Sequence, residues 1–411
     1  MIWTSNNVIT YIFIFFSLYF EVFLLITFIE NLRKTKKEEK TIITRYPTVT
    51  VVVPAFNEEK TVAKTIETLL RLDYPKNKLK ITVVDDGSRD GTWSELQKYK
   101  NHPQVEIFQK ENGGKFTALN FAITHSTSEI IGCLDADSFV EPGALKSIVS
   151  YFEESEAMAV TPAVKIHKPN NILRHLQRNE YNMGVFNKKV LGHLEAINVT
   201  PGPFSFFRRE VFEKIGLFKH AHNTEDMEIA MRMQKHGLKI RNAHRACVYT
   251  VGPATFKGLY KQRLRWMYGY MRNLIDYKEM VLTRKYGNLS MFFLPLSAVM
   301  ILTALYYTIM ILVNIVNSII MRVIKFNSVG FFWTWPKFDW FYVDANALVF
   351  LAIILVTLSL ITISIGSRIS DNRWGLSIHS LYFPFIFPII SLVWLVKAIY
   401  NIITKEKTSW R

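Results

Sequence analysis

Residues 48–92 decide the fold, and they read TVTVVVPAFNEEKTVAKTIETLLRLDYPKNKLKITVVDDGSRDGT. Thr48–Val53 and Lys80–Val84 are short apolar runs rich in β-branched residues, which predicts two buried strands. The segment between them, Glu58–Leu72, carries apolar residues at helical spacing, which predicts a connecting helix. A strand, a helix and a second strand in this order predict a parallel pair of strands.

The same alternation continues along the chain. Thr92–Tyr99 predicts a second helix, and Val105–Phe108 and Glu129–Leu134 predict two further buried strands. The expected fold class is therefore α/β, with a mostly parallel sheet covered by helices on both faces. Ligands of such sheets bind at the carboxyl ends of the strands.

The composition does not fit a single soluble domain. Of the 411 residues, 49% are hydrophobic and 20% charged, which suits a soluble domain joined to membrane-spanning segments. The net charge of +16 could attract nucleic acid, but basic residues beside apolar spans more often meet anionic lipid, so we expect no nucleic-acid partner. Cys133 and Cys247 match no metal spacing and no disulfide framework, which indicates a reducing compartment.

Apolar runs lie at both ends of the chain. Val8–Ile29 has no basic leader or cleavage site, so we expect a membrane anchor rather than a signal peptide. The basic segment 31–45 follows it, which predicts an N-terminus outside and a cytoplasmic domain after the anchor. Ser290–Met321 is too long for one straight span and too short for two, so we expect an interfacial piece, bent at Pro295, that leads into a span. Two further spans are expected at Ala345–Ile365 and Leu376–Tyr400.

These runs divide the chain into three parts and predict a multi-pass protein of the cell membrane. We expect a transmembrane helix in residues 1–30 and a cytoplasmic domain in residues 31–288, with interfacial helices near residues 255–280. Residues 289–411 would then form a membrane region with about three spans. One span before the domain and three after it would leave the C-terminus outside.

Polar clusters follow three of the predicted strands. In Asp135-Ala136-Asp137, the two carboxylates would project to the same side of an extended backbone and could share one Mg²⁺ or Mn²⁺ ion. A solvated pair of turn carboxylates is the alternative. Asp85 and Asp86 could accept hydrogen bonds from a nucleobase or could simply form a tight turn.

Lys115 ends the sequence Asn-Gly-Gly-Lys, but this is not a phosphate-binding P-loop. That motif needs Gly at position 109 and Ser or Thr at position 116, where the chain has Gln109 and Phe116. Lys115 could still serve as a point charge for phosphate, and an ordinary exposed lysine is the alternative.

Three later motifs each allow two interpretations. Glu225 and Asp226 precede a helical pattern, where they could complement the helix dipole or supply a general base. The aromatic run after Pro201-Gly202-Pro203 could pack in the core or form a platform for a sugar ring. The stretch YKQRLRW (260–266) could be an interfacial basic helix or part of a site that binds a ligand.

Together these motifs resemble the membrane-embedded processive family 2 glycosyltransferases, which include cellulose, chitin, hyaluronan and poly-N-acetylglucosamine synthases. The resemblance spans Thr48 to about Arg272 and rests on PAFNEE, VVDDGSRDGT, GGK, CLDADS, PGPFSFFRRE, TEDMEIAMRMQKHG and VGPATFKGLYKQRLRW. The apolar segments also fall where that family has them. Two departures are Met267-Tyr268-Gly269, where relatives often have Ala-Gln-Gly, and a tail with only three spans.

The resemblance implies the nucleotide-sugar-binding fold called GT-A and a set of site residues. It implies that the uridine is held by Asn57, Glu58, Asp85 and Asp86, and that Lys115 binds the diphosphate. Asp135 would contact the nucleotide and, with Asp137, the metal; Asp226 would be the general base. The acceptor and diphosphate side would include Gly202, Glu225 and the QxxRW residues Gln262, Arg263, Arg265 and Trp266, with Trp266 stacking on the acceptor sugar.

The implied reaction is inverting transfer from a UDP-sugar, of the N-acetylglucosamine or glucose type, to a growing β-linked polysaccharide, coupled to export. A small accessory membrane subunit is a candidate partner. The alternative is a non-processive transferase that moves one sugar to a membrane lipid, as in the ceramide glucosyltransferase-like members. A silent scaffold is disfavoured, because every acidic residue that the chemistry needs is present.

Overall fold

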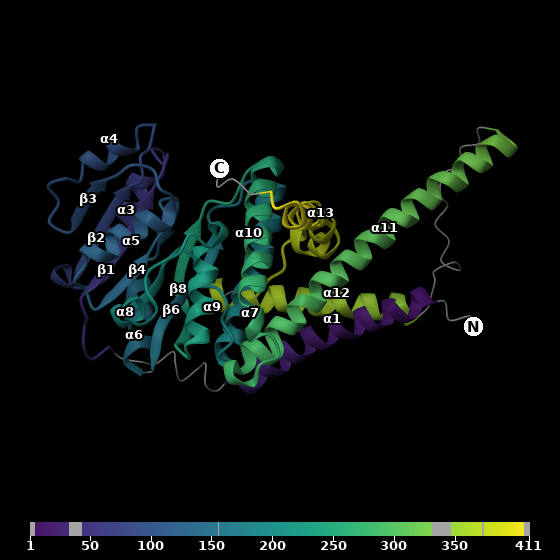
Figure 1. Cartoon of the computed structure of the whole chain (residues 1–411), viewed down its shortest axis with the longest axis horizontal. Coiled ribbons are helices and arrows are strands. Elements are labelled where there is room, and N and C mark those ends of the chain that lie inside the picture. Colours follow the sequence, from purple (N-terminus) through teal and green to yellow (C-terminus); the bar gives the residue numbers. More distant parts are fainter. Residues whose placement is uncertain (1–4, 33–42, 155, 331–346, 372–373, 407–411) are drawn as a thin grey trace.

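The computed structural model describes residues 5–32, 43–154, 156–330, 347–371 and 374–406. An α/β domain lies on one side of the molecule, and long apolar helices extend from it on the other (Figure 1). Most of the basic segment that underlies the predicted membrane orientation, residues 33–42, lies outside the described residues.

The α/β domain is built on a sheet of eight strands in the order β3-β2-β1-β4-β7-β6-β8-β5. The strands are β1 (Val49–Ala55), β2 (Leu79–Asp85), β3 (Val105–Gln109), β4 (Ile130–Cys133), β5 (Ser138–Val140), β6 (Ala157–Ile166), β7 (Ser205–Arg208) and β8 (Lys239–Thr250). Its helices are α3 (Val62–Leu70), α4 (Thr92–Gln97), α5 (Lys115–His125), α6 (Ala144–Glu154), α7 (Ile172–His193), α8 (Arg209–Ile215), α9 (Glu225–Lys235) and α10 (Phe256–Asp276).

The four strands predicted from the sequence are confirmed, and β3, β2, β1 and β4 form a parallel half-sheet. The other half is mixed: β7 runs antiparallel to β4 and β6, β5 runs antiparallel to β8, and only β6 and β8 pair in parallel. Antiparallel strands need no crossover helix, so the strand and helix alternation does not signal them. The expected helix Glu58–Leu72 is too long, because residues 57–61 form the turn that precedes α3.

Hydrophobic side chains fill both faces of the sheet. Val51 and Val53 of β1 pack into one cluster with Ile66 and Leu69 of α3. Val52 points to the opposite face, where its cluster includes residues of α5 and α9. The core therefore anchors β1, α3, α5 and α9 rigidly, and each of these elements ends beside the polar clusters noted above.

The aromatic run after Pro203 belongs to the core. Phe204, Phe206 and Phe207 are each 0% exposed, and the first two rings meet edge to face with centroids 4.7 Å apart. A Cβ atom on Gly132 would lie 2.2 Å from the Phe206 ring, so only glycine fits beneath it. Core packing is the right interpretation, and a sugar platform formed by these rings is ruled out because no ring face is open.

Within the described residues, four helices are long and apolar enough to cross a membrane. They are α1 (Ser5–Glu30), α11 (Leu294–Val329) with a preceding π-helical turn (Leu289–Phe293), α12 (Ala347–Asp371) and α13 (Ile378–Thr404). α1 packs beside α12, and α10 packs against α13 (Figure 1). The four apolar runs of the sequence are thus helices, although the first two residues of the run Ala345–Ile365 lie outside the described part.

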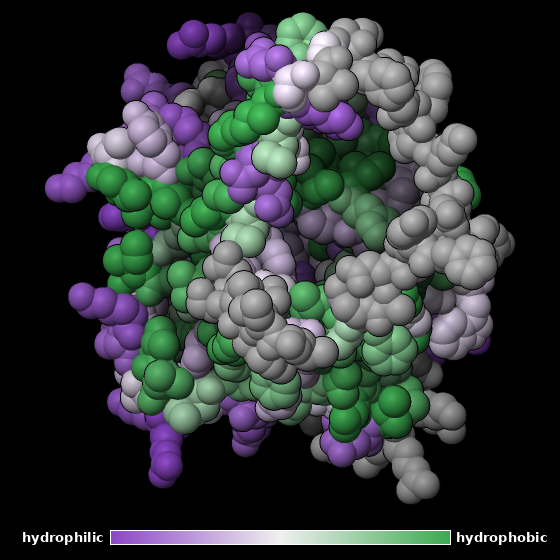
Figure 2. Space-filling model, turned by 90° about the vertical axis from the view of Figure 1, so that its right-hand side faces the viewer, coloured by the Kyte–Doolittle hydropathy of each residue, from purple (hydrophilic) through white to green (hydrophobic). Residues whose placement is uncertain are grey.

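Helix α11 departs from expectation. No interfacial piece breaks the run from residue 290 to residue 321, because a single helix of 36 residues continues from the π turn. Pro295 lies in the first turn of α11, directly after the π-helical turn. At 1.5 Å per residue α11 is about 54 Å long, well beyond a bilayer core of about 30 Å, and apolar side chains cover much of the surface at this end of the molecule (Figure 2).

Candidate active site at the sheet edge

The loop that precedes Lys115 is held in place by Asp86. This carboxylate is 1% exposed and accepts hydrogen bonds from the backbone N–H of Gly113 at 3.1 Å and of Gly114 at 2.8 Å. The Lys110 ammonium pairs with it at 2.6 Å. The Asp86 carboxylate therefore stabilises the conformation of residues 110–114 directly.

The neighbouring turns are tied together in the same way. The Asp85 carboxylate accepts hydrogen bonds from the backbone N–H of Ser88 and from the Gln109 amide, both at 3.0 Å. The Asn57 side chain accepts a hydrogen bond from the backbone N–H of Arg89 at 2.9 Å. Asn57 is left-handed, with φ of 56°, a conformation that asparagine tolerates better than most residues. These side chains fix the rim formed by the ends of β1 and β2.

Lys115 is the first residue of α5 and lies at the centre of an acidic cluster. Its ammonium lies 2.6 Å from an Asp135 carboxylate oxygen and 3.4 Å from Glu225. Burial acts to lower the pKa of Lys115, but the Asp135, Glu225 and Asp226 carboxylates outweigh it and raise this pKa above its usual value. Lys115 therefore remains a cation at any physiological pH, and it joins the end of β4 to the start of α9.

Gly202 borders this ion pair closely. A Cβ atom at position 202 would lie 2.5 Å from the Lys115 ammonium nitrogen and 2.9 Å from an Asp135 oxygen. Real Cβ atoms do not approach other atoms so closely, so any side chain here would displace the pair. The glycine gives the backbone of the Pro-Gly-Pro turn access to the charged centre.

Asp135 and Asp137 lie in a turn, not on the extended backbone expected from the sequence. The backbone N–H of Ser138 donates to the Asp135 carbonyl at 3.0 Å and closes this turn. Burial and the nearby Asp135 and Glu58 carboxylates raise the pKa of Asp137 to about 7. Buried like charges of this kind suit a hard divalent cation, which prefers carboxylate oxygens. Among the described residues no group of three or more His, Cys, Asp or Glu could hold a metal ion.

Asp226 sits in the first turn of α9. Burial and the adjacent Glu225 raise its pKa to about 6, against the opposing effects of Lys115 and Arg265. Thr224 occupies the N-cap position but makes no side-chain capping bond, because its hydroxyl donates to the Ala221 carbonyl at 2.9 Å. The two acidic residues thus lie at a favourable helix N-terminus, yet their charges face the cluster around Lys115.

The QxxRW residues lie on α10, between the α/β domain and the apolar helices. Arg263 is 4% exposed, and its guanidinium bonds Glu180 of α7 at 2.5 Å and Gln262 at 2.9 Å. The same group stacks over the Trp266 ring at 4.0 Å. Arg263 therefore holds α7 and α10 together, while Arg265 is the arginine of this motif that acts on Asp226.

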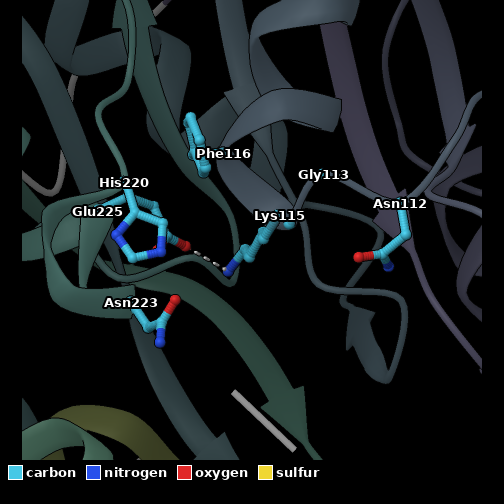
Figure 3. Close-up of a pocket in the computed structure, with 8 residues that line it drawn as sticks. Asn112, Gly113, Lys115, Phe116, His220, Asn223 and Glu225 are labelled. Atoms are coloured by element: carbon cyan, nitrogen blue, oxygen red, sulfur yellow. Dashed lines mark ion pairs between the residues drawn. The ribbon is translucent and has the colours of Figure 1, made fainter. Parts of the chain in front are cut away.

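A cavity of about 390 Å³ opens beside Lys115. Figure 3 shows the ion pair between the Lys115 ammonium and the Glu225 carboxylate in the wall of this cavity, with His220 and Asn223 on the same side as Glu225. The Phe116 ring and the His220 ring meet edge to face at 5.5 Å. The cavity falls within the range of about 300 to 1,000 Å³ that is usual for small-molecule sites, and its wall residues are Asn112, Gly113, Gly114, Lys115, Phe116, His220, Asn223 and Glu225.

The structure brings most of the predicted residues to one edge of the sheet, and it adds helix α7, which the sequence interpretation missed. Glu180 of α7 binds Arg263, and the charge of Asp226 acts on Lys188 of the same helix. Charged residues at positions 180 and 188, two helical steps of four residues apart, are the signal that could have indicated this face.

Comparison with known proteins identifies the family. Residues 47–269 match the model of the family described as glycosyltransferase-like family 2. The chain belongs to this glycosyltransferase family. The matched region contains every predicted site residue, from Asn57 to Trp266.

Several relatives of this glycosyltransferase are polysaccharide synthases. A poly-β-1,6-N-acetyl-D-glucosamine synthase of Staphylococcus epidermidis is 26% identical over 364 residues, which cover 87% of this chain and 84% of that protein. The enzyme of the same name from Staphylococcus aureus strain COL is 30% identical over 224 residues, 54% of each chain. A mannosyltransferase from Pyrobaculum calidifontis, solved with GDP-mannose and Mn²⁺, aligns with a TM-score of 0.59 at 18% identity, covers 96% of this chain and 99% of that one, and confirms the GT-A-like fold.

Proposed function

We propose that this glycosyltransferase is a processive inverting enzyme that transfers N-acetylglucosamine from UDP-N-acetylglucosamine to a growing β-1,6-linked polysaccharide. The observation that carries the proposal is the similarity to a synthase of that product over 364 residues, 87% of the chain, which is more than residues 31–288 alone could supply. The site supports it chemically, because the half-buried carboxylate of Asp226 lies among the charges of Lys115 and Arg265, two cations that could stabilise a diphosphate leaving group.

In this mechanism Asp226 takes the proton from the acceptor hydroxyl as that oxygen attacks the anomeric carbon. The bond from the anomeric carbon to the diphosphate breaks, and its electron pair leaves with UDP. Lys115 and Arg265 stabilise the negative charge on the leaving group. Inversion needs this single base and no second carboxylate on the opposite face of the sugar. The Trp266 ring, held under the Arg263 guanidinium, would support the acceptor sugar.

A divalent ion fits this site, and Asp137, with Asp135, would hold it. When bound, Mg²⁺ or Mn²⁺ would neutralise charge on the departing diphosphate. Removal of the ion by EDTA should therefore lower UDP release to background, and added Mn²⁺ should restore it. UDP release that persists in EDTA would remove the metal role of these two aspartates. In this proposal Asn57, Glu58, Asp85 and Asp86 shape the uridine side of the site.

We place the enzyme in the cell membrane with its catalytic domain, residues 31–288, in the cytoplasm. The basic residues between 31 and 45 support this orientation, because positive charge favours the cytoplasmic side. Residues 289–411 would form the membrane base through which the polymer is exported. This region has three of the four apolar helices, so a small accessory membrane subunit is a candidate to complete the export path.

Product analysis tests the proposal. The purified protein in lipid vesicles would be supplied with each of several UDP-sugars, and the product would be sized and its linkages mapped. We expect a long β-1,6-linked polymer from UDP-N-acetylglucosamine. A single sugar attached to a lipid would instead establish the non-processive alternative, and a polymer of another sugar or linkage would correct the substrate alone.

A further inference from the structure

One face of helix α7 lies along the proposed acceptor side of the site and is not explained by the mechanism above. Glu180, Gly184 and Lys188 are spaced by four residues, so they occupy successive turns of the same face. Glu180 anchors this face to Arg263 and thereby to the Trp266 ring. Helix α7 also packs against α12 and α13, so this helix lies where the α/β domain meets the apolar helices.

The middle of this face is open. A Cβ atom built on Gly184 would have no atom within 4 Å apart from its own chain neighbours and helix backbone. Gly184 is exposed, so this turn of α7 borders open space rather than the packed interior. The space one turn before Lys188 leaves room for a ligand along the helix between Glu180 and Lys188.

Lys188 is a partly buried cation with no hydrogen-bond or ion-pair partner among the residues that the structure describes. Burial lowers the pKa of Lys188 to about 8, and Asp226 is the group that opposes this effect. The next residue, Lys189, differs, because its ammonium lies 3.1 Å from His244. An ammonium group with three unused hydrogens is costly to keep away from water unless a ligand accepts them.

We propose that Lys188 binds the acceptor sugar, donating hydrogen bonds to oxygens of the terminal residue whose hydroxyl Asp226 deprotonates. This inference rests on the proposed function. During transfer the hydroxyl proton moves to Asp226 and the oxygen bonds to the anomeric carbon, while Lys188 keeps its own protons throughout. Its hydrogen bond stabilises the negative charge that develops on the attacking oxygen.

The two lysines near Asp226 divide the site into a donor side and an acceptor side. Asp135, Glu225 and Asp226 all act on Lys115, which places it on the diphosphate side. Only Asp226 acts on Lys188. Lys188 lies on α7 whereas Lys115 begins α5, so the two ammonium groups come from different elements, and Lys188 shares its helix with Glu180, the partner of Arg263. In the proposal, Lys188 therefore contacts the acceptor and Lys115 the leaving group.

The test compares Lys188→Met and Lys188→Arg with the wild-type protein in lipid vesicles. An N-acetylglucosamine oligosaccharide serves as the acceptor, and UDP release is followed with and without it. In Lys188→Met we expect the KM for the acceptor to rise about tenfold or more, because a charged hydrogen bond to the ligand is lost. The Kd for UDP and the slow release of UDP to water should change less than about twofold. Lys188→Arg should recover a substantial part of the acceptor affinity.

Lys214→Met is the matched control, because Lys214 is an exposed lysine on α8 with only a surface ion pair to Glu210. It should match the wild type in every measurement. The melting temperature of Lys188→Met should not fall, since the change removes a poorly solvated charge. An unchanged acceptor KM in a well-folded Lys188→Met protein overturns the inference while leaving the proposed function intact. A wild-type protein that transfers sugar to no oligosaccharide contradicts the proposed function itself.

Discussion

Two groups of acidic side chains lie along the same sheet edge and differ in the groups that surround their carboxylates. Asp85 and Asp86, after β2, receive hydrogen bonds from backbone N–H groups, an amide and a lysine. Asp137 and Asp226, after β4 and at the start of α9, lie among other carboxylates, and burial raises the pKa of both toward neutrality. The carboxylates of the first pair are therefore stabilised by hydrogen-bond donors and a cation of the protein. The carboxylates of the second pair are destabilised by other negative charges nearby.

This difference predicts that Asp85 and Asp86 stabilise the fold, whereas Asp137 and Asp226 have the ligand-binding and catalytic roles that the proposed function gives them. A carboxylate that accepts several hydrogen bonds stabilises its loop, so its loss should weaken the folded state. A buried carboxylate beside others of the same sign destabilises the folded state and persists because catalysis or metal binding requires it. The comparison predicts opposite outcomes for substitutions that look alike in the sequence.

The largest effect should come from Asp226→Asn. The amide has the shape of the carboxylate but cannot take a proton, so we expect transfer to fall about 1,000-fold or more. UDP affinity should stay within about twofold of the wild type, and the melting temperature should hold or rise because a crowded charge is gone. Steady-state UDP release, UDP titration and a thermal melt check these three points.

Asp73→Asn is the matched control for this change. Its carboxylate is 64% exposed and pairs with Lys146 at the surface, and exposed pairs of this kind contribute little. It should leave transfer and stability unchanged. Transfer close to wild type in Asp226→Asn would eliminate Asp226 as the base.

Asp86→Ala should show the opposite behaviour, with stability lost first. The change leaves the N–H groups of Gly113 and Gly114 and the Lys110 ammonium without their acceptor. We expect the free energy of unfolding to fall by about 2 to 4 kcal/mol, or a melting temperature lower by about 6 °C or more. Asp86→Asn should lose less, since its carbonyl oxygen can still accept. An unchanged melting temperature in Asp86→Ala would contradict the division of the two groups.

The parallel half of the sheet could be predicted from the sequence, because β1, β2 and β4 are short buried runs dominated by β-branched residues. The antiparallel strands could not. β7 is only four residues long and its aromatic run allowed two interpretations, which burial alone decides. The sequence was enough to locate the motif residues of the site. It could not show which carboxylates receive hydrogen bonds and which lie beside other carboxylates, because that depends on contacts between segments far apart in the sequence. Lys188 was missed because its neighbour Asp226 lies on another helix.

Gly202→Ala should weaken catalysis with little effect on stability. The added methyl group would lie 2.5 Å from the Lys115 nitrogen and must push the Lys115 and Asp135 pair apart. Displacement of about 1 Å at a catalytic centre costs up to about 100-fold in rate, so we expect kcat/KM to drop about 10- to 100-fold. Gly143→Ala is the control, because a Cβ atom there meets nothing within 4 Å. A fully active Gly202→Ala enzyme would show that this pair need not keep its geometry.

The smallest effect we expect is a loss of rate on mild acidification. Asp226 acts as a base only when ionised, and its pKa of about 6 means that protonation removes it as the pH falls through that value. At pH 5 about one tenth of the molecules would keep the Asp226 carboxylate ionised, so kcat should be about tenfold lower than at pH 8.

Lys115 remains charged over this range, because its pKa is raised above its usual value. Asp137 has a pKa of about 7 without metal, so the profile should be measured at two saturating Mn²⁺ concentrations. If the midpoint pH of the decline in kcat shifts with the Mn²⁺ concentration, the decline is caused by protonation of Asp137. If the midpoint does not shift, it is caused by protonation of Asp226. A kcat that stays constant down to pH 5 contradicts both assignments.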